Sequence, residues 1–144
     1  DFKKINFSLS NCILIHGGGW KKLEKTKVSN NTFKRKLYEI YNFKKIINYY
    51  GMIEQTGSIF FECEQCGAFR TTCFSDIFVR DKEFMVKKTG RGLLQLFSLL
   101  PSSYPGHNII TEDEGKILED KCSLCKNNKR FIVYGRAKES EISR

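Results

Sequence analysis

The chain has 144 residues, of which 13% are aromatic and only two are proline. This composition is typical of a folding sequence, and the length allows one ordinary core or two small subdomains. No apolar run approaches the roughly 20 residues that a helix needs to cross a bilayer. No secretory signal is visible either, so we expect a cytoplasmic protein without a membrane span.

The net charge of +9 raises the question of a nucleic-acid partner. The lysines between residues 21 and 45 are scattered, and Lys34, Arg35 and Lys36 fall on the polar face of a predicted helix. This distribution favours a solvated basic face over a dedicated nucleic-acid interface. An anionic partner such as a carrier protein, CoA or RNA is the alternative.

The first third of the chain predicts a strand–loop–helix–strand unit. Residues 12–15 are expected to form a buried strand that runs into three glycines. Residues 29–32 offer side chains that cap a helix. Beyond them, apolar residues recur with helical spacing, at Phe33, Leu37, Ile40 and Tyr41. A second short strand is predicted at residues 46–49.

From Thr56 onward, short alternating or β-branched segments predict antiparallel strands. They are residues 58–63, 76–80, 83–87, 93–100, 108–111, 115–118 and 130–134. Residues 88–92 form a glycine-punctuated turn. The predicted fold class is therefore α+β, an α/β unit followed by a β-rich subdomain.

Two loops follow the two strands of the first unit. Gly17, Gly18 and Gly19 follow one strand, and residues 50–55, Tyr-Gly-Met-Ile-Glu-Gln, follow the other. The glycines are not a P-loop, because Trp20 and two lysines follow them in place of Gly-Lys-Ser/Thr. Alone, they indicate only a turn or a close backbone approach. Parallel strands, however, bring such loops to one sheet edge, where open α/β sheets bind nucleotides.

Two further short motifs follow in the later part of the chain, Thr111-Glu112-Asp113 and Gly135-Arg136. Each motif is weak alone, but the four in this order resemble those of adenylate-forming enzymes. The resemblance is greatest to the acyl-protein synthetases (LuxE type) and their phenylacetate-CoA ligase relatives. It implies the later part of the large domain of such an enzyme.

The activity that the resemblance implies is ATP-dependent acyl activation. A fatty or aryl carboxylic acid and ATP give acyl-AMP and pyrophosphate, and the acyl group then passes to the thiol of a protein cysteine, a carrier or CoA. Both ends of the chain look cut, so we expect a fragment that is inactive by itself.

The resemblance also implies roles for individual residues. Gly17, Gly18 and Gly19 would line the adenine, and Tyr50, with Gly51, would flank it. An aromatic face suits adenine. Glu54 would be the catalytic carboxylate that holds Mg²⁺ on the phosphates, since Mg²⁺ prefers hard oxygen ligands. Ile53 stands where the common motif has Thr, so a hydroxyl that can touch a phosphate is missing.

Asp113 and Arg136 would complete the nucleotide site. The resemblance implies that Asp113 accepts hydrogen bonds from both ribose hydroxyls, which one carboxylate can do. Arg136 would reach the ribose or a phosphate as a charged donor. His16 is either a structural histidine or a polar group near the acyl carboxylate. His107 has no assigned role.

The cysteines form a separate pattern of two Cys-x-x-Cys pairs. A tetrahedral thiolate set of this kind favours a structural Zn²⁺ site, with free thiols or disulfides as alternatives. The set is Cys63, Cys66, Cys122 and Cys125. Cys12 and Cys73 are left over and are expected to be buried apolar residues.

The predicted organisation has three parts. Residues 1–56 end the adenylating layer, residues 57–134 form the β-rich subdomain with the cysteine pairs, and residues 135–144 begin a hinge, located near Lys138-Glu139. Two rival functions remain. One is a basic nucleic-acid-binding module that contains zinc, and the other is a non-catalytic carrier-docking domain.

Overall fold

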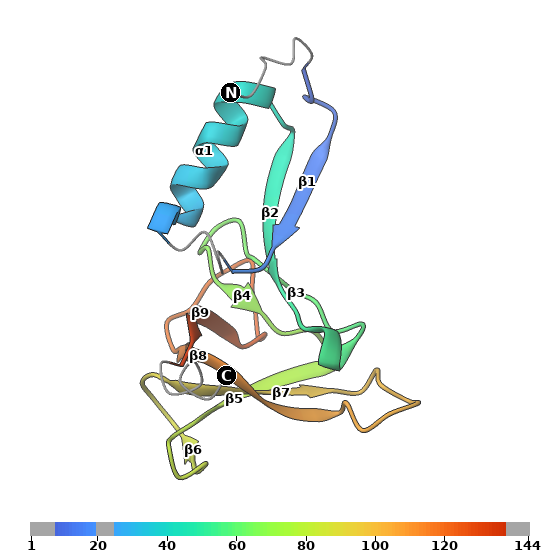
Figure 1. Ribbon diagram of the computed structural model, residues 1–144, viewed down its shortest axis with the longest axis vertical. Helices are drawn as coiled ribbons and strands as arrows, with labels where there is room; N and C mark the ends of the chain where they lie inside the picture. The colour runs from blue at the N-terminus through green and yellow to red at the C-terminus, as the bar shows by residue number, and fades with distance from the viewer. Residues whose placement is uncertain (1–7, 20–24, 138–144) are drawn as a thin grey trace. The chain divides into compact units, whose positions relative to one another are not determined.

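The structure is a computed structural model that describes residues 8–19 and 25–137. It divides into two compact units, one ending at Tyr49 and the other beginning at Tyr50. One α-helix and nine strands account for most of the regular structure of the described residues (Figure 1). The mixed, mostly β architecture confirms the predicted α+β class. No helix in the described part of the chain is long and apolar enough to cross a membrane.

The first unit is a parallel strand pair linked by a helix (Figure 1). Strand β1 (Ile13–Gly17) leads through the glycines to α1 (Asn30–Tyr41), and β2 (Lys45–Tyr50) follows. In the parallel register, Ile13 lies opposite Lys45 and Gly17 lies opposite Tyr49. The predicted strand–loop–helix–strand unit is confirmed.

Local sequence fixes both ends of α1. The Ser29 hydroxyl accepts a hydrogen bond from the Thr32 amide at 3.1 Å, which satisfies one of the amides left open at a helix start. Asn42 adopts a left-handed conformation with φ of 53° and donates its amide to the Tyr38 carbonyl. Asn tolerates this conformation better than most residues, so the helix ends there.

Strand β1 is not the buried strand that its apolar sequence predicts. Ile13 is 54% exposed and Ile15 is 52% exposed. The other face of the strand is covered, because the His16 ring packs edge-on against Phe33 of α1 with 5.0 Å between ring centroids. A single helix covers only one face of a strand pair, and this leaves the alternate side chains accessible within the described residues.

The second unit is built on a six-stranded antiparallel sheet in the order β4-β9-β8-β7-β5-β6. Its strands are β4 (Phe69–Arg70), β5 (Ser75–Arg80), β6 (Val86–Lys87), β7 (Gly92–Ser98), β8 (Asn108–Leu118) and β9 (Arg130–Arg136). The 3₁₀ turn η2 (Ile53–Gln55) and the short strand β3 (Phe60–Phe61) precede the sheet. The antiparallel prediction for this part of the chain is confirmed.

The core of the second unit consists of apolar side chains that alternate along the central strands. Leu94 and Leu96 of β7 are fully buried beside Ile77 of β5 and Phe131 of β9. Phe60 meets the Phe131 ring edge-to-face at 5.3 Å. Burial of such side chains contributes roughly 1.5–3 kcal/mol each, and this core holds the strands that carry the candidate site.

Two strand predictions differ from the structure. The segments at 108–111 and 115–118 are one strand, β8, which continues through an irregularity at Glu114–Gly115. Residues 83–85, predicted as strand, belong to a turn. There, the Asp81 carboxylate accepts hydrogen bonds from the amides of Glu83 and Met85, at 3.1 and 2.7 Å. A side chain that binds nearby amides in this way competes with strand pairing.

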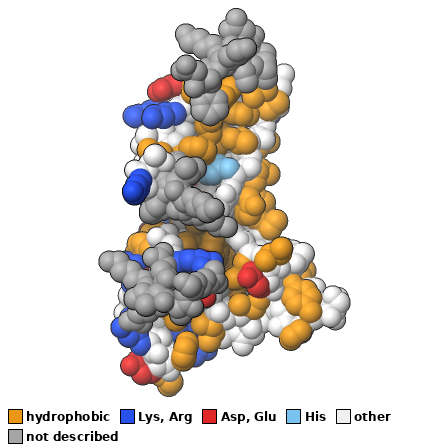
Figure 2. Space-filling view, in the orientation of Figure 1, with side chains coloured by type: hydrophobic (Ala, Val, Ile, Leu, Met, Phe, Trp, Pro, Cys, Tyr) orange, Lys and Arg blue, Asp and Glu red, His pale blue; other side chains and the backbone are white. Residues whose placement is uncertain are grey.

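The basic side chains do not gather into one patch on the face drawn in Figure 2. Lys and Arg side chains are dispersed there among hydrophobic and neutral ones. Several are held by acidic partners, among them Lys129 with Asp76 and Arg136 with Glu112. This distribution agrees with the interpretation of the charge as a solvated basic face.

Candidate functional site

The glycine loop starts inside β1, because Gly17 is the last residue of that strand. A Cβ at Gly17 would lie 2.8 Å from the Tyr49 carbonyl and 2.7 Å from its ring, closer than real Cβ contacts allow. Gly18 has a φ of 88°, a region that side chains disfavour. A Cβ at Gly19 would meet nothing within 4 Å among the described residues. Sterics therefore explain the first two glycines, while the described residues impose no steric requirement on the third.

We expect Gly17→Ala to destabilise the chain by about 1–3 kcal/mol, because the fixed Tyr49 carbonyl cannot move away from the new methyl group. Gly19→Ala is the matched control and should change stability by less than about 0.5 kcal/mol. Urea unfolding of the two variants measures the difference. An equal effect of both substitutions would contradict the steric account of Gly17.

Tyr50 and Asp113 are joined directly in the second unit. The Tyr50 hydroxyl donates a hydrogen bond to Asp113 Oδ2 at 2.8 Å. The Tyr50 ring lies among Phe60, Phe69 and Phe131, with centroids 5.9–6.3 Å away. Burial and then the Asp113 charge raise the pKa of the Tyr50 hydroxyl well above its usual value, so it remains a donor. Tyr50 therefore orients the Asp113 carboxylate, the group that the family resemblance implies for ribose.

Asp113 and Arg136 are neighbours across β8 and β9. Their backbones pair in the antiparallel register. The Arg136 guanidinium lies 3.1 Å from the Glu112 carboxylate, which holds it at the same edge of the strand pair. The backbone of Asp113 is fixed as well, since its amide donates to the Thr111 hydroxyl at 3.1 Å. The structure thus joins Tyr50 to Asp113 by a hydrogen bond and pairs the backbone of Asp113 with that of Arg136. The hinge predicted near Lys138-Glu139 lies outside the described residues.

Glu54 lies exposed in the turn η2, three residues after Gly51 and beside Ile53, which is 86% exposed. Its neighbour Gln55 is buried and anchors the turn. The side-chain amide of Gln55 donates hydrogen bonds through Nε2 to the backbone carbonyls of Leu96 and Gly106, at 3.3 and 2.9 Å. Glu54 is near enough to Tyr50 for its charge to contribute, as the weakest cause, to the raised pKa of the Tyr50 hydroxyl.

The turn around His107 supports η2, a role that the sequence did not reveal. The Tyr104 hydroxyl accepts a hydrogen bond from the Thr56 amide at 2.8 Å. A Cβ at Gly106 would collide with the Tyr104 ring, so glycine is required there. The signal was present in the sequence as Tyr104-Pro105-Gly106, but nothing in the sequence connects these residues to a turn about 50 positions earlier. His107 contributes its carbonyl to the Ser98 amide.

The predicted residues divide between the two units. Gly17, Gly18 and Gly19 belong to the first unit, while Tyr50, Gly51, Glu54, Asp113 and Arg136 belong to the second. Gly17 is opposite Tyr49, the residue bonded to Tyr50. His16, placed by the sequence near an acyl carboxylate or in a structural role, packs on Phe33.

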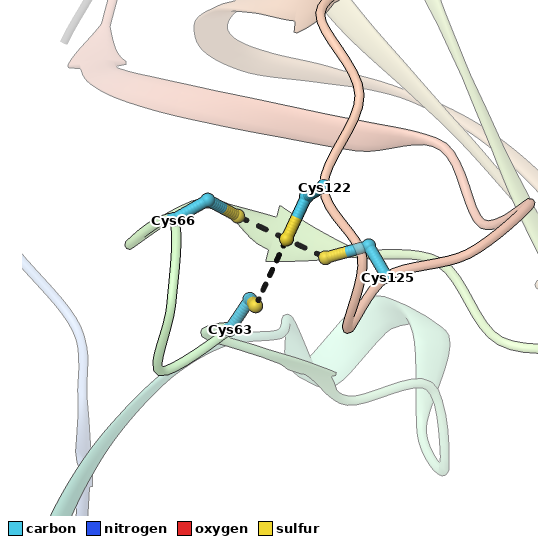
Figure 3. A group of neighbouring side chains, drawn as sticks. All are labelled: Cys63, Cys66, Cys122 and Cys125. Carbon is cyan, nitrogen blue, oxygen red and sulfur yellow. Dashed lines mark hydrogen bonds between the residues drawn. The ribbon is translucent and has the colours of Figure 1, made fainter.

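The four paired cysteines converge on one point, as Figure 3 shows. All four Sγ atoms lie within 4.8 Å of one another. Cys63 Sγ is 3.8 Å from Cys122 Sγ, and Cys66 Sγ is 3.8 Å from Cys125 Sγ. Disulfide sulfurs would be about 2.05 Å apart, so these cysteines are not disulfide-bonded. A Zn–S length of about 2.3 Å implies about 3.8 Å between the sulfurs of a regular tetrahedron.

The backbone of both cysteine loops follows the same pattern. The residue after each second cysteine has a positive φ, 67° at Gly67 and 52° at Lys126. In each loop the amide of that residue donates to the carbonyl of the first cysteine, at 2.8 and 3.2 Å. The two loops are also linked to each other, because the Ser123 hydroxyl donates to Gln65 Oε1 at 2.8 Å. Two similar turns thus present four sulfurs to a common centre.

The local environment shifts the pKa values of two of the thiols in opposite directions. Burial opposes ionisation of Cys63, but hydrogen bonds from the amides of Cys66 and Gln65 and from neighbouring thiols outweigh it and lower the pKa of the Cys63 thiol. Burial raises the pKa of the Cys125 thiol above its usual value, and the neighbouring cysteines raise it further. Backbone amides directed at a sulfur favour the thiolate, which is the form that binds a metal.

The two remaining cysteines differ from the prediction. Cys12 and Cys73 are both exposed, not buried apolar residues. Cys12 follows a turn in which its amide donates to the Leu9 carbonyl, and Cys73 lies in the connection between β4 and β5. Residues in such connections lie outside the core, so the apolar character of the thiol does not determine its burial.

Comparison with known proteins extends these observations. Solved structures of similar fold include the inhibitor-bound N-terminal domain of FACL13 from Mycobacterium tuberculosis, with 15% identity and a TM-score of 0.55 over 95% of this chain and 33% of that chain. McyG A-PCP complexed with phenylalanyl-adenylate has 18% identity and a TM-score of 0.57, over 92% and 26% of the two chains. Apo MatB from Rhodopseudomonas palustris has 16% identity and a TM-score of 0.57, over 88% and 25%.

The chain therefore spans about a quarter to a third of the length of these structures, and at this identity the likeness shows the fold alone. No curated protein matches the chain significantly. A family model described as acyl-protein synthetase, LuxE, matches residues 1–143, nearly the whole sequence. The chain belongs to the LuxE family of acyl-protein synthetases.

Proposed function

We propose that the chain is part of a cytoplasmic ATP-dependent acyl-activating enzyme. The enzyme joins a fatty or aryl carboxylic acid to AMP, releases pyrophosphate, and then transfers the acyl group to a thiol of a protein, a carrier or CoA. Membership of the LuxE family supports the ligase class. McyG, which shares the fold, was solved with phenylalanyl-adenylate, an intermediate of this kind.

The observation that carries the proposal is the hydrogen bond from Tyr50 to Asp113, with Arg136 paired beside Asp113. The Tyr50 hydroxyl binds one oxygen of the carboxylate and fixes its plane. A carboxylate held in this way is preorganised to accept two vicinal hydroxyl groups, the feature that distinguishes ribose from other parts of a nucleotide. Arg136, whose guanidinium pairs with Glu112 on the neighbouring residue of β8, would supply a positive charge for the ribose or the α-phosphate.

The remaining residues would hold the adenine and the phosphates. The loop Gly17–Gly19 offers backbone without side chains, which suits a flat base, and no described residue lies within 4 Å of a Cβ at Gly19. Glu54 is exposed on a turn anchored by Gln55, so its carboxylate can serve as a Mg²⁺ ligand. When bound, Mg²⁺ neutralises phosphate charge during displacement of pyrophosphate.

The proposal makes a direct prediction for the 144-residue chain. Even with a carboxylic acid substrate present, the chain alone should not catalyse the exchange of pyrophosphate into ATP. The reason is that its sequence contains no phosphate loop rich in glycine, serine and threonine. A protein that contains these residues together with such a loop should catalyse the exchange, and Asp113→Asn should abolish most of it. Pyrophosphate exchange by the chain alone would refute the proposal that the phosphate loop needed for the reaction lies outside these residues. Absence of any exchange in the longer protein would refute acyl activation.

We also propose that Cys63, Cys66, Cys122 and Cys125 bind one structural Zn²⁺. The four-sulfur donor set, the 3.8 Å separations and the paired turns support this assignment. Four thiolate ligands leave no open position for a substrate, so such a site joins two loops and does no chemistry. It would link segments 59 residues apart at the edge of the β-rich unit.

A further inference from the structure

Gln55 holds the turn η2 at a fixed place in the β-rich unit. The residue is 1% exposed, and its Nε2 donates hydrogen bonds to two backbone carbonyls, those of Leu96 and Gly106. Because both partners are acceptors, the orientation of the side-chain amide is determined. Oε1 is buried without a hydrogen-bond partner among the described residues, which is unfavourable for a polar atom. An apolar side chain would avoid this cost, but it would lack the two directed bonds that fix the residue after Glu54.

The Tyr104 hydroxyl fixes the other end of the same turn. It accepts a hydrogen bond from the Thr56 amide at 2.8 Å, two residues after Glu54. The backbone bond that closes η2, from the Gln55 amide to the Met52 carbonyl, is long at 3.2 Å. Short 3₁₀ turns have poor hydrogen-bond geometry of this kind, so the conformation of η2 depends on contacts from outside the turn.

The Tyr104 side chain is itself held by its own loop. The Gly106 amide donates to the Tyr104 carbonyl at 2.8 Å. A Cβ at Gly106 would collide with the Tyr104 ring, so the ring covers the backbone of that glycine. Pro105 lies between the two residues and has a restricted φ. The hydroxyl that binds Thr56 is therefore presented by a rigid loop and needs little ordering.

We propose that Tyr104 is a positioning residue for Glu54 and that it sets how strongly Mg²⁺ tightens nucleotide binding. The inference rests on the proposed function, in which Glu54 is the Mg²⁺ ligand. Glu54 is exposed, and ordering of an exposed metal ligand opposes binding. Tyr104 reduces this opposition because it orders the backbone of the turn beforehand. Outer contacts that orient a metal ligand contribute to metal affinity in this way.

The test variant is Tyr104→Phe, which keeps the ring over Gly106 and removes only the hydroxyl that binds Thr56. Glu54→Gln removes the proposed metal ligand and gives the full size of the effect. Tyr38→Phe is the matched control, because it removes a phenol hydroxyl from a residue that is 41% exposed on α1 of the first unit.

The measured quantity is the ratio of two ATP dissociation constants, one in EDTA and one in saturating Mg²⁺, each from calorimetry. We expect Glu54→Gln to abolish the gain in affinity that Mg²⁺ gives. Tyr104→Phe should reduce this gain by roughly two- to tenfold, the range that corresponds to one hydrogen bond. Tyr38→Phe should match the wild type. AMP affinity in EDTA should be equal in all four proteins, because it does not involve Glu54.

The outcomes separate this inference from the proposed function. A full Mg²⁺ effect in Tyr104→Phe, beside a lost effect in Glu54→Gln, would overturn the positioning role alone. Weaker AMP binding in Tyr104→Phe would indicate a general loss of structure and would also contradict that role. A wild type whose ATP affinity does not change with Mg²⁺ would contradict the proposed metal role of Glu54, and the inference with it. A wild type that binds neither nucleotide would contradict the proposed nucleotide site as a whole.

Discussion

Replacement of Cys125 by Ser is expected to remove the bound metal and to destabilise the chain by more than about 3 kcal/mol, since metal loss exceeds the usual range of point mutations. The expected effect is large because the metal would join two buried loops 59 residues apart, in addition to the Gln65–Ser123 hydrogen bond and the β4–β9 pairing. Cys125 is also 1% exposed, so its replacement leaves a hydroxyl in a site built for sulfur.

Metal content and thermal unfolding check this expectation. The wild type should carry one zinc per chain, and a strong chelator should lower its unfolding temperature to that of Cys125→Ser. Cys73→Ser is the control, because Cys73 is exposed and lies outside the cluster. A tetrahedral four-sulfur site also suits iron. A coloured chain that contains iron would therefore contradict zinc as the metal, while it would still support a metal site at the four cysteines. Equal metal loss in Cys73→Ser would contradict the cluster.

Asp113→Asn is expected to weaken nucleotide binding by roughly tenfold or more, because hydrogen bonds to a charged group contribute about 1.5–3 kcal/mol. The substitution conserves shape, and the amide oxygen of Asn can still accept the Tyr50 hydroxyl. What is lost is the charge and the capacity to accept two ribose hydroxyls together. AMP titration followed by calorimetry or NMR measures the change.

Glu119→Gln is the control for Asp113→Asn. Glu119 is exposed just after β8, and its replacement by Gln removes the same charge away from Tyr50 and Arg136. It should leave AMP affinity unchanged. Equal weakening by both substitutions would indicate a general effect of charge and would argue against a ribose contact.

Local sequence signals predicted much of the fold. The hydroxyl of Ser29, the spacing of Phe33, Leu37 and Tyr41, and the two Cys-x-x-Cys pairs act over a few residues, so their consequences are visible in the sequence. The structure brings the four cysteines of these pairs together, as the paired spacing predicted.

The long-range contacts of the site were not predictable in the same way. Tyr50 and Asp113 are separated by 63 positions, and only strand pairing brings the phenol to the carboxylate. Gln55 is a polar residue beside the exposed Glu54, and nothing in its local sequence indicates burial. It is buried because its side-chain amide donates hydrogen bonds to the carbonyls of Leu96 and Gly106. Strand β4 was missed because two paired residues, Phe69 and Arg70, carry no periodic pattern.

We propose that Asp113, oriented by Tyr50, recognises the ribose of an adenine nucleotide. The most direct test compares the binding of AMP and of 2′,3′-dideoxy-AMP to the wild type and to Asp113→Asn. We expect the wild type to prefer AMP by roughly tenfold or more and Asp113→Asn to lose most of this preference. A wild type that binds both nucleotides equally, or an Asp113→Asn variant that keeps the full preference, would contradict it.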